Sequence, residues 1–517
     1  MKRLAILALA GAALFAAIPA RAQHAQDTVR ISQQEPVGTL DAYLDVRPEI
    51  FFLRDAVFDT LVTYDYAKRI FVPLLATSWT HVDDTTLEFK LRHDVTWHDG
   101  KPFTAADVVY TVDYLIDPKV RLRTKSDYEW IAGATAVDPY TVRIKEKRPT
   151  PADLALLATQ LQIYPEHVHG PLKDKVDFGH HPIGTGPYRA VQVDPAKGVI
   201  LEKRKSYPQG SYAKPAGTIG RIQVVGIPDA GARVASLLAG NLDLVRDIPA
   251  NQSAALEASG QFAVTLGDTF GVYYIMMDAA GRSGLKPLTD RRVREAILRS
   301  IKPDDLKRII AGKWAGQVSD PKGLCDPSQI GCKLSVTPPS YDPATAKKLM
   351  AEAGYPTGFT VNLTAFSYLS GKIAEVISGE LRAINVNAKV QQMTFAAYRA
   401  QQIAGKQQIL IGAWGGGAVP DVDHTLEFLF SPGARDYHHD KRFFDLVQAS
   451  EHELDQAKRE KETGEVFDLA TSLDYLVPLT RYPVLWVHSK DLTLSGFDTH
   501  PMAPWGLSYD MLSWAKK

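Results

Sequence analysis

The sequence contains little cysteine and no excess of charge. Only two of its 517 residues are cysteine, and 59 lysine and arginine residues are balanced by 59 aspartate and glutamate residues. A chain without a positive excess or a basic tract has no obvious surface for nucleic acid or anionic lipid. We therefore expect no nucleic-acid partner.

Long apolar runs are also missing, except at the start of the chain. Residues 4–18 form an apolar run that follows a positive region and precedes the small-residue pattern at residues 20–22. These features predict a secretory signal peptide over residues 1–22, cleaved after Ala22. The run is shorter than the ~20 residues that span a bilayer, and no cysteine follows the cleavage site to carry a lipid anchor. The sequence thus predicts a soluble, exported chain, most simply periplasmic.

The motifs of common hydrolases and nucleotide-binding proteins are absent from the sequence. It has no GxSxG or HExxH motif, and Gly184-x-Gly186 lacks the Gly-Lys-Ser/Thr of a phosphate loop. The histidines at 180–181, 424 and 438–439 show no metal-ligand spacing. We predict no catalytic residue, no metal site and no cofactor. A secreted hydrolase of peptides or conjugates stays an alternative, because catalytic triads are assembled in space rather than in sequence.

The two cysteines lie close together in the stretch GLCDPSQIGCKL. Asp-Pro-Ser and Gly331 are turn-forming residues that would bring Cys325 and Cys332 together. An oxidising compartment favours a disulfide between them. A metal site is the alternative, but the segment contains no histidine. We predict the disulfide.

The length and the residue patterns indicate more than one α/β unit. A mature chain of about 500 residues exceeds what one hydrophobic core usually serves, so two or more lobes are expected. Alternating apolar and polar residues predict strands over residues 87–91 and 142–145. Capped helices are predicted after Thr104 and after Asp342. This alternation of strands and helices is typical of α/β lobes.

The stretch VTWHDGKPFTAADVVYTVDYL poses a choice between active site and scaffold. His98 beside Asp99 looks like half of a catalytic dyad, but no nucleophile or oxyanion site is visible near it. The stretch lies between a predicted strand and a predicted helix, and Asp99-Gly100 is a turn dipeptide. We predict that Trp97 packs this turn against the core and that Asp99 binds turn amides.

The same region carries a family resemblance. LLATSWTHVDDTTLEFKLRHDVTWHDGKPFTAADVVYTVDYL, residues 74–115, closely resembles the signature region of the family 5 extracellular solute-binding proteins, the peptide, opine and nickel receptors of ABC importers. Further similar stretches follow in the family's order and cover most of the mature chain: VFDTLVTYD (57–65), PIGTGPYRA (182–190), ARVASLLAGNLDLV (232–245), LTDRRVREAI (288–297) and YDPATAKKLMAEAGYPTGF (341–359).

The resemblance implies an α/β fold of the type II periplasmic binding protein class. Such a protein has two lobes joined by a two-segment hinge, an extra domain in the larger members, and a ligand cleft between the lobes. The apolar stretches FGVYYIMMD (270–278) and YPVLWVHS (482–489) would form the hinge. The expected units are lobe I (27–60, 182–269 and 484–517), an extra domain packed on it (61–181) and lobe II (270–483).

The best candidate for ligand contact is the stretch IGAWGGGAVPDVDHTLEFLF, residues 411–430. Trp414 offers a broad apolar wall, and Gly415 and Gly416 would let a ligand backbone approach closely. The resembled family often has an acidic loop here in the cleft, and Asp421 and Asp423 match it. The alternative is that Trp414 belongs to the core and that the glycines form an ordinary loop.

Two departures from the family bear on the ligand. Dipeptide-binding relatives place an aspartate just after Trp-Gly for the ligand's amino group, and an arginine on a later strand for its carboxylate. Gly417 and Thr364 stand at the matching positions here, with Phe366 and Tyr368 as candidate contacts nearby. Capture of a dipeptide by its two termini is therefore disfavoured. A longer peptide, or a non-peptide ligand such as an opine or a metal chelate near His424, is favoured instead.

The remaining candidate contacts come from two strands. Gln34 and Glu35 follow the first predicted strand, where the resembled family often touches ligand, although a solvated loop fits them equally well. Tyr273 and Tyr274 alternate faces on a crossing strand, so at most one should face the cleft. The resemblance implies a monomeric periplasmic receptor that captures a peptide or peptide-like solute and delivers it to the permease of an ABC transporter.

Overall fold

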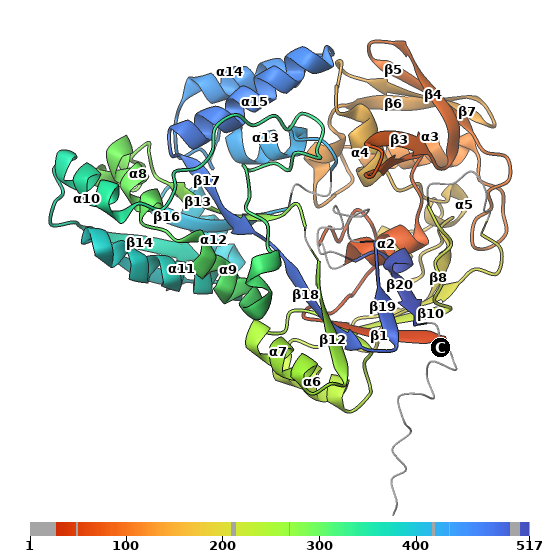
Figure 1. Cartoon of the computed structure of the whole chain (residues 1–517). Coiled ribbons are helices and arrows are strands. Elements are labelled where there is room, and N and C mark those ends of the chain that lie inside the picture. The colour runs from red at the N-terminus through yellow and green to blue at the C-terminus, as the bar shows by residue number, and fades with distance from the viewer. Residues whose placement is uncertain are drawn as a thin grey trace, which may run out of the picture.

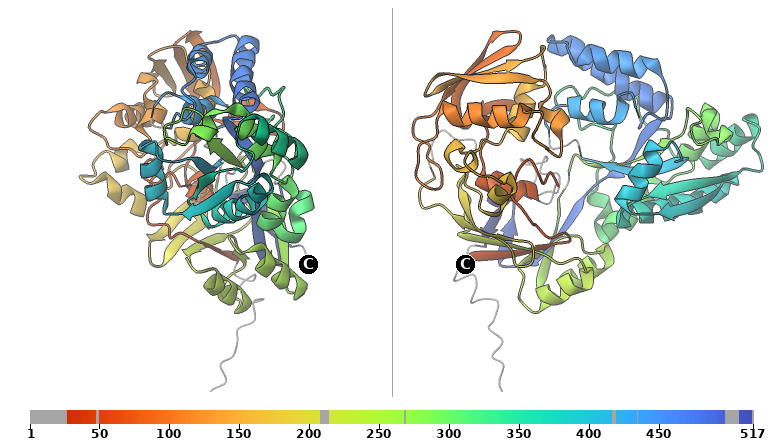
Figure 2. Two further views of the ribbon diagram at one scale, coloured as in Figure 1. Left: turned by 90° about the vertical axis from the view of Figure 1, so that its left-hand side faces the viewer. Right: turned by 180° about the vertical axis from the view of Figure 1, so that it is seen from behind.

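The protein is described by a computed structural model, shown in Figures 1 and 2. The predicted signal peptide lies outside the described residues, and no described helix is long and apolar enough to cross a bilayer. Two bodies lie on either side of a long pair of strands (Figure 1). The structure describes residues 27–47, 50–207, 214–267, 269–415, 419–433, 435–496 and 507–515.

Lobe I is built on a seven-stranded sheet with the order β12-β18-β11-β1-β10-β9-β8. The central strand β1 is parallel to β10 and β11, and the outer strands run antiparallel to their neighbours. The elements are β1 (Thr28–Gln33), α2 (Phe51–Val57), β8 (Tyr188–Asp194), β9 (Gly198–Lys203), β10 (Arg221–Gly226), α6 (Ala230–Leu238), β11 (Leu244–Val245), α7 (Ala250–Ala258), β12 (Phe262–Gly267), β18 (Val484–Ser489), β19 (Leu492–Leu494) and β20 (Leu512–Trp514).

Lobe II contains a five-stranded sheet with the order β15-β14-β16-β13-β17, in which β13 is antiparallel to both of its neighbours. Its strands are β13 (Val272–Met277), β14 (Thr360–Ala365), β15 (Asn387–Gln392), β16 (Ile409–Trp414) and β17 (Leu476–Arg481). Its helices are α8 (Arg291–Arg299), α9 (Pro303–Ala311), α10 (Pro343–Glu352), α11 (Tyr368–Glu380), α12 (Phe395–Ile403), α13 (Asp423–Phe430), α14 (Lys441–Ser450) and α15 (Gln456–Ser472).

Helices cover both faces of the lobe II sheet, which explains why the sequence of β13 is apolar throughout. All six residues of β13 are buried. Tyr273 and Ile275 belong to the cluster formed with α8 and α11, whereas Tyr274 and Met276 belong to the cluster formed with α13, α14 and α15. A strand buried on both faces loses the alternation that marks a half-exposed strand.

The extra domain packs on lobe I through one continuous hydrophobic core, which contains Ile31 of β1 together with Leu87 and Phe89 of β5. Its four-stranded sheet has the order β4-β5-β7-β6 and is antiparallel throughout. The elements are β2 (Val62–Asp65), β3 (Ile70–Pro73), β4 (Ala76–Asp83), β5 (Thr86–Leu91), α3 (Ala105–Ile116), β6 (Ile131–Asp138), β7 (Thr141–Glu146), α4 (Asp153–Gln160) and α5 (Glu166–His169). Short 3-10 helices, η2 (Lys125–Tyr128) and η3 (Lys175–His180) here and η4 (Lys286–Thr289), η5 (Gly312–Gln317), η6 (Leu381–Ile384) and η8 (Tyr509–Met511) elsewhere, complete the described elements.

The Trp97-His98-Asp99 stretch serves the scaffold of the extra domain. Trp97 is fully buried, and its indole Nε1 lies 3.4 Å from a carboxyl oxygen of Asp107. His98 bridges two glycine residues: its Nδ1 accepts from the amide of Gly184 (3.1 Å), and its Nε2 lies 3.0 Å from the carbonyl of Gly186. Both nitrogen atoms of the His98 ring therefore bind the backbone at Gly184 and Gly186, where the chain leaves the extra domain.

Two connections, from β12 to β13 and from β17 to β18, run from one lobe into the other. β12 pairs with β18 in lobe I, and β13 pairs with β17 in lobe II, so both connections cross between the same two sheets (Figures 1 and 2). At the crossing, the amide of Tyr482 donates to the carbonyl of Gly271 (2.8 Å), and the Thr269 hydroxyl donates to the carbonyl of Tyr482 (2.7 Å). A narrow two-segment connection of this kind permits hinge motion. The two-lobed α/β fold is thus confirmed, while the residue boundaries of its units stay a prediction.

Candidate functional site

A large cavity separates the extra domain from lobe II, and we call it the interlobe cleft. Its volume is about 990 Å³, which is at the upper end of the range for ligand pockets. One wall consists of extra-domain residues between Arg123 and Trp130, with Lys147, Arg148 and Thr150 of the loop after β7. The other wall comes from lobe II and includes Arg399, Trp414, Asp423, His424, Glu427, Phe428, Arg435 and Glu451.

Trp414 is the last residue of β16 and is held in place on the lobe II wall. Its half-buried ring stacks on Phe428 of α13, with ring centroids 4.1 Å apart and planes inclined by 14°. The indole Nε1 donates to the Thr425 hydroxyl (3.0 Å), and the His424 ring lies edge-on at 5.4 Å. The Arg435 guanidinium lies 3.9 Å from the centre of the Phe428 ring. These contacts fix a rigid apolar platform that faces the cleft.

The glycines after Trp414 are described only in part. Among the described residues, none places a heavy atom within 4 Å of the position that a Cβ on Gly415 would take, so this side of the glycine is open to them. Gly416, a predicted ligand contact, lies outside the described residues, as does Gly417. The close approach of a ligand backbone to this loop therefore stays a prediction.

The two predicted acidic residues occupy different environments. Asp421 is buried, and its carboxylate accepts from both terminal nitrogens of Arg459 (2.7 and 2.8 Å), so its charge is already compensated within lobe II. Asp423 lines the cleft and lies 3.4 Å from the same guanidinium. Burial raises the pKa of Asp423 to about 7, although Arg459 acts against this shift. Of the two, Asp423 is the residue placed to meet a ligand.

The structure does not bring the other candidates to this cleft. Gln34 and Glu35 are exposed at the end of β1, and neither lines the interlobe cleft. Tyr273 is fully buried and stacks on Tyr482, with ring centroids 4.7 Å apart. Tyr274 is buried on the opposite face of the sheet, against Gly412. Their direct contact with ligand stays a prediction that this arrangement does not support.

Phe366 and Tyr368 lie near the start of α11. Phe366 is half-buried and packs edge-on against Phe395, with centroids 5.2 Å apart. Tyr368 is 59% exposed. Thr364, at the position where dipeptide-binding relatives carry an arginine, is buried in β14. None of these side chains lines the interlobe cleft.

Sequence reasoning missed the charged residues that line the cleft. Both walls carry bases and acids, and one ion pair joins Arg148 of the extra domain to Glu451 of lobe II at 3.7 Å. Burial lowers the pKa of Arg435 and raises the pKa of Glu427. The signal was a short group of bases in each of RLRTK (121–125) and KEKR (145–148), which lie opposite the Trp414 loop in the structure. The basic residues of the cleft are Arg123, Lys125, Lys147, Arg148, Arg399 and Arg435.

A second cavity, of about 440 Å³, lies at the junction of lobe I with the extra domain. It is lined by α2, by the β2–β3 turn and by the segment around Tyr509. Lys214 lies at this cavity and forms a buried ion pair with Asp59 (2.6 Å), which also accepts from the Thr185 hydroxyl (2.9 Å). The lysine charge is therefore neutralised within lobe I.

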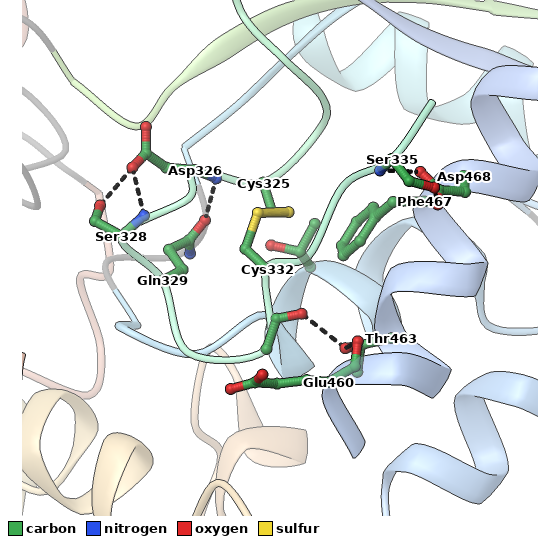
Figure 3. The surroundings of a disulfide bond; sticks show 12 residues. Cys325, Asp326, Ser328, Gln329, Cys332, Ser335, Glu460, Thr463, Phe467 and Asp468 are labelled. Carbon is green, nitrogen blue, oxygen red and sulfur yellow. Dashed lines mark hydrogen bonds between the residues drawn. A yellow bond between two sulfur atoms is a disulfide. The ribbon is translucent and has the colours of Figure 1, made fainter. Parts of the chain in front are cut away.

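The predicted disulfide between Cys325 and Cys332 is confirmed (Figure 3). The loop that it closes lies against the chain that follows the Trp414 glycines. The Ile330 amide donates to the Pro420 carbonyl (2.7 Å), and the Val422 amide donates to the Ile330 carbonyl (3.0 Å). Because these backbone hydrogen bonds lie on both sides of Asp421, the disulfide loop helps to position the residues that lead into α13.

Two lobes, a two-segment hinge and a large cleft that combines charged residues with an aromatic platform define a solute-binding protein. The comparison with protein families agrees: the profile described as bacterial extracellular solute-binding proteins, family 5 middle, matches residues 71–437. This match covers more than half of the chain, and the chain belongs to that family. The interpretation as a binding protein rather than a hydrolase is confirmed by this membership.

Individual relatives cover nearly the whole chain. The glutathione-binding protein GsiB of Salmonella typhimurium is 29% identical over 455 residues, which is 84% of this chain and 85% of that protein. DppA of Helicobacter pylori, in complex with the peptide STSA, has a TM-score of 0.74 at 21% identity, covering 96% of this chain and 100% of that one. MoaA of A. tumefaciens R10, in complex with mannopinic acid, has a TM-score of 0.74 at 23% identity, covering 95% and 99%.

Proposed function

We propose that the protein captures a peptide or peptide-like solute in the interlobe cleft and delivers it to the permease of an ABC importer. In this proposal residues 1–22 are removed on export, and the mature monomer works in the periplasm. Lobe I with the extra domain and lobe II then close about the crossing at Gly271 and Tyr482. Closure would bring the basic extra-domain wall towards the Trp414 platform.

The observation that carries the proposal is the composition of the cleft. Trp414 and Phe428 provide an apolar platform, and charges of both signs surround it on two separate bodies. A zwitterionic, amide-containing solute matches such a surface, because its carboxylate and amine can each meet an opposite charge. Ligand pockets generally combine apolar walls with a few placed polar groups.

Two relatives and two positions of this chain support a solute larger than a dipeptide. GsiB is named for glutathione, and the DppA complex contains the peptide STSA. The positions that would hold both termini of a dipeptide carry Gly417 and Thr364 here, and the Thr364 side chain is buried. We therefore propose a solute of three or more residues, or a conjugate of similar size, held largely through its main chain.

The test is retention of an unchanged ligand. The mature protein is incubated with a mixture of di-, tri- and tetrapeptides and glutathione, separated from unbound material, and unfolded, and the released molecules are identified by mass. We expect a small set of tripeptides or longer molecules to be retained intact. Retention only of opines or metal–histidine complexes offered in a parallel mixture would replace the peptide assignment. Release of cleaved products would contradict a receptor.

A further inference from the structure

A histidine and two carboxylates converge in the extra domain, away from the Trp414 platform. His81 comes from β4, Glu146 is the last residue of β7, and Asp153 is the first residue of α4. One ligating atom from each lies within 4.8 Å of the others, and His81 Nε2 lies 2.7 Å from an oxygen of Asp153. Two strands and a helix therefore bring one nitrogen and two oxygen ligand atoms close together.

Glu146 is the unusual member of this group. The residue is only 2% exposed, and neither of its carboxyl oxygens makes a hydrogen bond of ordinary geometry to another described residue, although Thr150 and Asp153 lie close enough to shift its pKa. Asp153 is also buried, at 5% exposed, and adds a second carboxylate within reach of the first. A buried carboxylate without a partner costs free energy, and a second one nearby adds repulsion. A cation between the two would remove both costs.

The third ligand lies at the opening of the group. The His81 side chain is 48% exposed, and the β4–β5 ladder shifts register between His81 and Asp83. Such irregularities commonly redirect a side chain. An exposed imidazole above two buried carboxylates gives an ion a route of entry and lets the ring move outward by the small amount that coordination requires.

Although the sequence predicts no metal site, we propose that His81, Glu146 and Asp153 form a binding site for one divalent transition-metal ion of the Zn²⁺ type. Imidazole nitrogen and carboxylate oxygen are ordinary Zn²⁺ ligands at ~2.0–2.2 Å, and three protein ligands leave a fourth position for water. The ligands must lose their protons to bind, so metal binding releases protons to solvent. The site is separate from solute capture and does not depend on which solute the cleft holds.

The site is coupled to the cleft by a short loop. Glu146 and Asp153 flank residues 147–152, and this loop contributes Lys147, Arg148 and Thr150 to the cleft wall. A metal held at both ends of the loop would restrict its motion, and with it the Arg148–Glu451 ion pair across the cleft. The metal would thus brace one wall of the solute site without touching the solute.

The experiment measures Zn²⁺ on the untagged mature protein after chelation and dialysis. Isothermal titration and elemental analysis after gel filtration should give one Zn²⁺ per chain, and Co²⁺ should give a visible ligand-field spectrum. Glu146→Gln and His81→Gln should each weaken binding by more than about 100-fold, since even outer-shell changes cost 10–100-fold. Hydrogen exchange of residues 147–152 should slow when Zn²⁺ is added to the wild type.

A matched control is available in the same domain. His167 pairs with Asp99 at 2.7 Å, and within the described ranges no third metal-ligating side chain joins this pair. His167→Gln therefore removes a comparable imidazole and should leave Zn²⁺ binding unchanged. Melting temperatures measured without metal identify any variant that fails to fold, and the wild-type titration stands without variants. Absence of Zn²⁺ binding by the folded wild type overturns the proposal. Equal Zn²⁺ binding by the wild type and both ligand variants overturns it as well.

Discussion

Replacing Trp414 by alanine tests whether this residue contacts the ligand in the cleft or only belongs to the hydrophobic core. The change removes a ring that stacks on Phe428 and donates to Thr425. Loss of the aromatic pair costs ~0.5–1.5 kcal/mol beyond the burial of the ring, and loss of the hydrogen bond costs about 1 kcal/mol, so the free energy of unfolding should fall by at least ~1.5–2.5 kcal/mol. If the platform contacts the solute, affinity should also fall by ~1–3 kcal/mol, the range for an aromatic anchor.

The two quantities are measured on the same protein. Urea unfolding gives the stability, and calorimetric titration of the retained solute, at a temperature where the variant is folded, gives an expected loss of about 5- to 150-fold in affinity. Trp79 offers a matched control, because it is half-buried in the extra domain and does not line the interlobe cleft. Trp79→Ala should lose stability but keep its affinity. Unchanged affinity of folded Trp414→Ala would refute the cleft assignment.

Three further predictions concern the scaffold. Replacing Cys325 and Cys332 by serine should lower the free energy of unfolding by about 2.5 kcal/mol on the loop-entropy model. The urea midpoint of the variant should be lower than that of the wild type and should not change when reductant is added. An unaltered midpoint would show that the disulfide does not stabilise the fold. Trp97→Ala should cost ~3–5 kcal/mol of stability in the same assay, as for a fully buried aromatic, and a much smaller loss would contradict its core position. Burial lowers the pKa of His98 from 6.5 to about 4. As the pH falls from 6.5 to 4, the unfolded chain therefore takes up a proton before the folded chain does, and the free energy of unfolding decreases. His98→Asn should flatten this part of the stability curve and leave solute affinity unchanged, and a stable variant that no longer binds solute would contradict the scaffold role.

The sequence predicted those strands and helices that depend on the pattern of neighbouring residues. Alternation over residues 87–91 corresponds to β5, and the Thr104–Asp107 capping box begins α3 as expected. Asp342 caps α10 by accepting from the Thr345 amide. The disulfide was predictable for the same reason, because turn-forming residues lie between two nearby cysteines.

Contacts between distant segments could not be read from these patterns. Asp421 matched an acidic ligand loop, yet Arg459 of α15 neutralises it in the fold. The alternation of Tyr273 and Tyr274 limited the cleft to one of them, but helices on both faces of the sheet bury both. The basic wall of the extra domain was missed because its loops meet Trp414 only after the two bodies assemble. The sequence therefore offered Trp414 as a candidate contact, whereas the charged residues around it could not be predicted.

Solute capture at the Trp414 platform is measured most directly by native mass spectrometry of the mature protein as purified. We expect a complex that carries one small peptide-like molecule and releases it intact on unfolding. This molecule should be lost or strongly reduced in Trp414→Ala but kept in Trp79→Ala. A folded wild-type protein that retains no solute even when offered the peptide mixture, or equal retention by Trp414→Ala, would contradict capture at the Trp414 platform.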